Sequence, residues 1–132
     1  MHSESNSKNF TFSNEVRAVF SFLEKEYNFL FTATENIDTA KFEKKNLIIE
    51  FRRFSGHDPT VYFMNISFNY EGKEMEFADL ISMENSTLTQ FEIEALTASR
   101  NYSATTLEDT QNSLSLMADL IRKYSYKLLG KR

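Results

Sequence analysis

TTLEDTQNSLSLMADLIRKYSYKLLG, residues 105–130, decides the fold of this chain. Its large and apolar positions recur at alternating spacings of three and four residues: Leu107, Thr110, Leu114, Met117, Ile121, Tyr124 and Leu128. This alternation puts all of them on one face of an α-helix. Leu116, Leu120 and Leu129 widen that face, which suits packing on a sheet better than a narrow coiled-coil seam. We therefore expect an amphipathic C-terminal helix with Leu114, Met117 and Ile121 in the core.

The residues at both ends of this stretch agree with a helix. Thr105 and Glu108 have the spacing of a capping box, in which each side chain accepts a free amide of the first turn. Acids at 108–109 and bases at 122–123 and 127 match the helix dipole. Gly130 can adopt the left-handed conformation that ends a helix.

Composition limits the class of protein. A chain of 132 residues is long enough for one domain, so we expect a single domain over 1–132, with the polar residues 1–9 disordered. The absence of cysteine excludes disulfides and thiolate chemistry. No secretory signal and no apolar run of about 18 residues is present, which predicts a cytoplasmic protein rather than a membrane protein. The net charge of −4 disfavours nucleic acid and anionic membranes as partners.

The first half of the chain contains one helical and several strand patterns. Ser13 can cap a helix from Asn14 to about Glu26. Alternating apolar and polar residues then predict strands, separated by short turns, at 28–34, 39–44, 47–54, 60–70 and 74–77. Consecutive strands with short turns favour antiparallel pairing, so we expect a meander of four to five strands. Leu47, Ile49, Phe51 and Arg53 share one face of the third strand.

The segment between the sheet and the last helix is ambiguous. Asp79 can cap a short helix to about Glu84. Residues 86–102 fit either a strand or a helix, and we favour a helix over 90–99 because a capping-box pattern precedes it. Strands segregated from helices indicate an α+β fold. The first and last helices should cover one sheet face and leave the other partly solvated.

The sequence contains no convincing catalytic, cofactor or metal residues. His57 lies next to Asp58 within the strongest turn signal, 55–59, which indicates an exposed histidine rather than a general base. His2 and His57 lack the spacing of a metal site. The acid pairs 24/26, 74/76 and 92/94 are explained by solubility at least as well as by acid–base chemistry. We therefore do not expect an enzyme.

Two surface features suggest binding. Arg52 and Arg53, flanked by Phe51 and Phe54, have the composition of some nucleic-acid surfaces, but arginines in an acidic chain more often face solvent or pair with a glutamate. The second feature is an acidic segment whose only base is Lys73 and whose flanks are basic: Glu71, Glu74, Glu76, Asp79, Glu84, Glu92 and Glu94. It is either a solvated surface or a docking surface for a basic protein, for which opposite charge raises the association rate.

The pattern of residue types resembles small bacterial α+β immunity proteins of polymorphic toxin systems. The matching pieces are residues 20–29, 42–51 and 77–81, followed by the long last helix. The resemblance implies a non-enzymatic cytosolic protein that binds and masks a toxin, and it transfers no site residues. Small acidic α+β proteins with such a helix also resemble secretion chaperones, which are dimers that hold an effector segment. The oligomeric state, monomer or homodimer, stays open.

Overall fold

The computed structural model describes residues 10–33, 38–55, 57–75, 89–90 and 102–128. In chain order the elements are α1 (Phe12–Val19), α2 (Ser21–Tyr27), β1 (Leu30–Ala33), β2 (Thr39–Lys44), β3 (Leu47–Ser55), β4 (Tyr62–Tyr70), β5 (Lys73–Met75), β6 (Tyr102–Ser103) and α5 (Leu107–Leu128). The strands form one antiparallel sheet in the order β1-β2-β3-β4-β5, and β6 pairs with β4. The predicted α+β fold with an antiparallel meander is confirmed.

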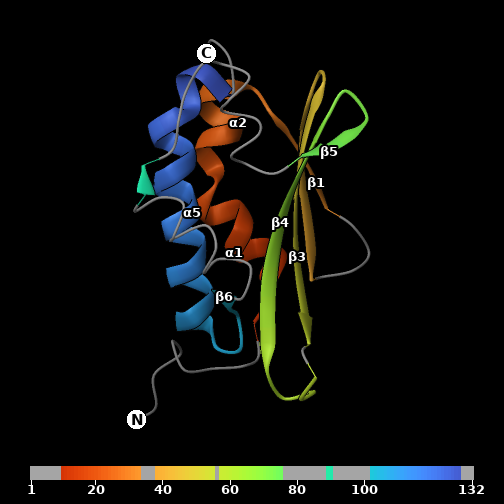
Figure 1. Ribbon diagram of the computed structural model, residues 1–132, viewed down its shortest axis with the longest axis vertical. Coiled ribbons are helices and arrows are strands. Elements are labelled where there is room, and N and C mark those ends of the chain that lie inside the picture. The colour runs from red at the N-terminus through yellow and green to blue at the C-terminus, as the bar shows by residue number, and fades with distance from the viewer. Residues whose placement is uncertain (1–9, 34–37, 56, 76–88, 91–101, 129–132) are drawn as a thin grey trace.

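The helices and the sheet form two layers. Figure 1 shows the sheet nearly edge-on, with α1, α2 and the long α5 on the same side of it. The core lies between these two layers. Successive side chains of a strand point to opposite faces of the sheet, so every second residue of each strand points to the helices. The largest fully buried side chains are Phe12, Phe20, Phe42, Phe51, Phe68, Leu23, Ile49, Met64, Leu114, Ile121 and Val16. The expectation that the first and last helices share one sheet face is therefore correct.

The N-terminal helix differs from the prediction of one helix over 14–26. It begins earlier, at Phe12 after Thr11, and it is interrupted at Phe20, whose backbone leaves the helical region at φ −102° and ψ 20°. Phe20 and Phe22 are both buried, yet residues two apart lie on nearly opposite sides of a straight helix. The break resolves this conflict: the Phe20 ring packs on Phe51 of β3, 4.7 Å between centroids, and the Phe22 ring packs under Arg122 of α5, 4.0 Å from its guanidinium carbon. Arg17 and Glu24 then form a two-point ion pair across the break, at 3.0 and 3.1 Å.

The strands and turns follow the predicted pattern closely. β2 coincides with the predicted strand, and β3 buries Leu47, Ile49, Phe51 and Arg53 on one face as expected. β1 begins two residues late because Asn28 takes the left-handed conformation that ends α2. β5 covers 73–75 rather than 74–77 as far as the structure describes it. The two-residue strand β6 begins at Tyr102, the last residue of the segment that fitted either a strand or a helix, and the amide of Ala104 continues it by donating to the carbonyl of Tyr62 at 2.8 Å.

The last helix confirms the predicted core positions. Leu114, Met117 and Ile121 are buried against the sheet side of the molecule. Leu116 was expected to widen the apolar face but is 38 % exposed, since it lies about 100° around the helix from Met117 and outside the buried stripe. The cap is also displaced by one residue. The helix is capped by the hydroxyl of Thr106, not of Thr105, which accepts a hydrogen bond from the amide of Asp109 at 3.1 Å.

Several predictions fall on residues outside the described ranges. These are the disordered start at 1–9, the helix expected at 79–84, the helix expected at 90–99 beyond its first residue, Gln90, and the stop at Gly130. Among the helices that the structure describes, none combines the length and the apolar character needed to cross a membrane.

Candidate functional site

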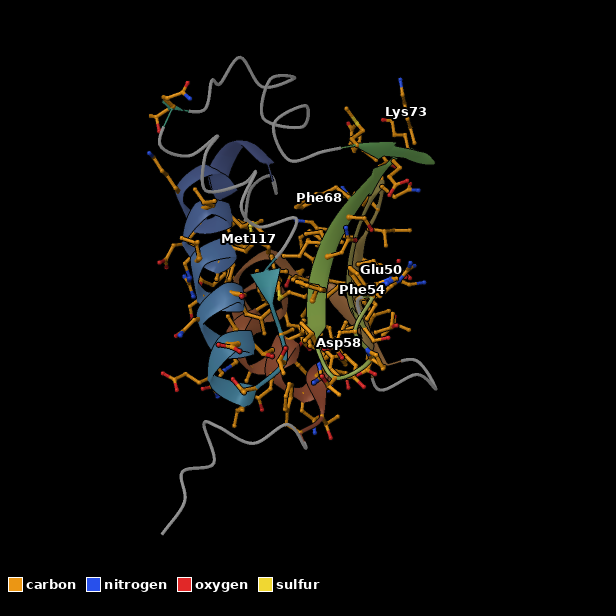
Figure 2. All side chains as sticks on the ribbon, turned by 60° about the horizontal axis from the view of Figure 1, so that its bottom comes forward. Glu50, Phe54, Asp58, Phe68, Lys73 and Met117 are labelled. Carbon is orange, nitrogen blue, oxygen red and sulfur yellow. The ribbon has the colours of Figure 1, made fainter. Side chains whose placement is uncertain are left out.

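The candidate site is the face of the sheet that points away from α1, α2 and α5, here called the open face. Figure 2 shows Glu50 and Phe54 directed to this side, whereas Phe68 and Met117 lie between the sheet and α5. The strand register aligns its residues in rows across the sheet. One row runs Leu30, Glu43, Ile48, Asn69, Glu74; the next runs Thr32, Lys41, Glu50, Ser67; a third runs Thr39, Arg52, Asn65.

An aromatic pair occupies one end of the open face. Phe54 of β3 stands directly opposite Phe63 of β4, and their ring centroids are 6.2 Å apart. Phe54 is 40 % exposed and is the second-last residue of the nine-residue pairing between β3 and β4. Strands of this length fix the rings on a rigid surface. Aromatic side chains, phenylalanine included, are enriched in protein interfaces.

Charged side chains occupy the middle of the open face, and they compensate one another. Lys41 and Glu43 approach to 3.9 Å along β2, and Arg52 and Glu50 approach to 3.3 Å along β3. All four side chains are partly or well exposed, so these pairs contribute at most about 1 kcal/mol each to stability. Because each pair joins one acid to one base, the centre of the open face carries charges of both signs and no net charge.

Residues 51–54 do not place their side chains on one common surface. Alternation along β3 sends Phe51 and Arg53 into the core, and only Arg52 and Phe54 reach the open face. Arg52 is already paired with Glu50. The four residues therefore form no continuous basic and aromatic surface.

We did not predict from the sequence that Arg53 is buried and stabilises the fold. It is only 8 % exposed, and its Nε donates to the carbonyl of Ala104 at 2.8 Å. A terminal nitrogen donates to the carbonyl of Thr105 at 3.3 Å, and another lies 3.6 Å from a carboxylate oxygen of Asp38. Both expected environments, solvent and a glutamate partner, are therefore wrong for Arg53. The alternation of side chains along residues 47–54 could have predicted its burial, because it places Arg53 on the same strand face as the apolar Phe51.

The structure describes two of the seven acids in the acidic segment. Glu71 and Glu74 are both exposed at the β4–β5 hairpin. Glu76, Asp79, Glu84, Glu92 and Glu94 lie outside the described residues. The amide of Glu71 donates to the carbonyl of Asn46, so the β2–β3 and β4–β5 turns adjoin. Exposed Lys45 and Lys73 stand at these same turns, and the described end of the segment therefore carries both signs of charge.

The other described residues that were considered for acid–base or metal chemistry lie in a turn or in ion pairs with arginines. His57 is exposed in the turn before β4, and the neighbouring Asp58 accepts hydrogen bonds from the amide and hydroxyl of Thr60 at 2.9 and 2.8 Å. Glu24 is held by Arg17, and Glu26 lies 3.7 Å from Arg122. Within the described ranges, no three His, Asp or Glu side chains gather as metal ligands would.

Comparisons with protein-family models, with curated proteins and with solved structures found no match for this chain.

Proposed function

We propose that this chain is a non-enzymatic protein-binding module that docks its partner on the open face of the sheet. The observation that carries the proposal is the ring of Phe54, which is 40 % exposed and is paired across β3 and β4 with the partly buried ring of Phe63. Interfaces are anchored by a few aromatic side chains surrounded by polar groups that exclude water. Arg52 and Asn65 in the adjoining row supply polar groups of that kind.

The partner class that the resemblance to immunity proteins favours is a toxin, which this protein would bind and mask in the cytoplasm. A toxin that acts on nucleic acid has a basic active site, because it must hold phosphate. The acidic segment would attract such a partner and the open face would anchor it. In this division of roles, Glu71 and Glu74 raise the association rate, and Phe54 sets the dissociation rate.

The test of the aromatic anchor begins with the product of the neighbouring gene, used as bait in a pull-down and then in a binding assay. We expect Phe54→Ala to weaken that affinity by at least about tenfold, as truncation of an anchor does. Leu116→Ala is the matched control, because Leu116 is similarly exposed at 38 % but lies on α5. Equal affinity of Phe54→Ala and wild type would refute docking on the open face.

The role of the acids is tested separately by charge reversal. Glu71→Lys with Glu74→Lys should slow association several-fold and change the dissociation rate little. Asp119→Lys is the control, since Asp119 is exposed on α5, in the layer of the molecule away from the sheet. Because the double variant changes the net charge by twice as much as Asp119→Lys, a loss from Asp119→Lys of half the size would mean that only the net charge of the protein matters.

A second candidate function is a dimeric secretion chaperone. The observation that favours it is the exposed edge strand β1, which offers two copies of the chain a place to join. The two candidates differ in the state of the partner. An immunity protein binds a folded toxin domain, whereas a chaperone binds an unfolded effector segment, so binding to a synthetic peptide of the effector decides between them.

A further inference from the structure

We draw no further inference here: the strongest candidate, the uncharged edge of the sheet at β1 with its exposed Leu30, carries none because nothing in the structure shows what covers this edge.

Discussion

Replacing Arg53 with alanine should destabilise the protein more than any other single charge removal among the described residues. Its guanidinium lies between the rings of Phe10 and Tyr62, 4.4 and 4.0 Å from their centroids. It also donates to two backbone carbonyls that precede α5, one of them on the fully buried Ala104. This one side chain therefore connects β3 to the N-terminal segment, to β4 and to the start of the last helix.

The magnitude follows from what the truncation leaves behind. Two hydrogen bonds from a charged donor are lost, each worth about 1.5–3 kcal/mol, and the Ala104 carbonyl is left buried without this donor. Removal of one member of a buried charged cluster typically costs about 3–5 kcal/mol. We expect Arg53→Ala to lower the free energy of unfolding by that amount. Native domains have only about 5–15 kcal/mol in total, so the loss is readily visible.

Urea denaturation measures the effect, and the chain supplies its own controls. Arg52→Ala changes the adjacent residue, which is 60 % exposed, and should cost less than about 1 kcal/mol. Asp38→Asn should cost less than Arg53→Ala, because the carboxylate oxygen 3.6 Å from the guanidinium is buried but both carbonyl bonds of Arg53 remain in that variant. If Asp38→Asn costs as much as Arg53→Ala, the ion pair dominates and our assignment to the carbonyls is wrong. An Arg53→Ala midpoint equal to that of Arg52→Ala would refute the cluster altogether.

Three further outcomes are expected. Ile121→Ala should cost about 2–5 kcal/mol in the same assay, because Ile121 is fully buried, and an unchanged melting temperature would contradict its placement. Glu71→Asn should raise stability by up to about 1 kcal/mol, since Glu71 and Gly72 have φ of 53° and 83° in a two-residue turn that prefers Asn-Gly. His57→Ala should change neither the melting temperature nor partner affinity, and loss of a purified catalytic activity in this variant would overturn the binding-module interpretation.

The parts of the fold that were predictable are those in which one local pattern decides the structure. Period-two alternation in 47–54 predicted that Leu47, Ile49, Phe51 and Arg53 share one face of β3, and the structure buries that face, although the burial of Arg53 was not predicted. The three-and-four spacing of Leu114, Met117 and Ile121 predicted the buried face of α5. In both cases the apolar side chains have only one way to reach the core.

The errors arose where tertiary contacts compete with local preference. Thr105 fits a helix cap, but its hydroxyl accepts the amide of Tyr62 at 3.0 Å, and Thr106 caps the helix instead. The helix is interrupted at Phe20 because Phe22 is buried as well. Two residues that are two positions apart cannot both lie on the buried face of one straight helix, so the helical spacing alone did not predict the break. The open face was predictable as a solvated face, yet the Phe54–Phe63 pair was not, because it depends on the register between two strands.

The salt dependence of partner association separates the two docking surfaces. The centre of the open face carries two acids and two bases in ion pairs, so a partner anchored there through Phe54 should bind with rates that change little with salt. A partner steered by the acidic segment should associate more slowly as the Debye length falls from about 10 Å at 0.1 M salt to about 3 Å at 1 M. Glu71→Asn isolates the second effect, because it removes one acid while favouring the turn. Steep salt dependence that Glu71→Asn reduces would assign steering to the acids. Salt-independent association that Phe54→Ala weakens would assign binding to the open face alone.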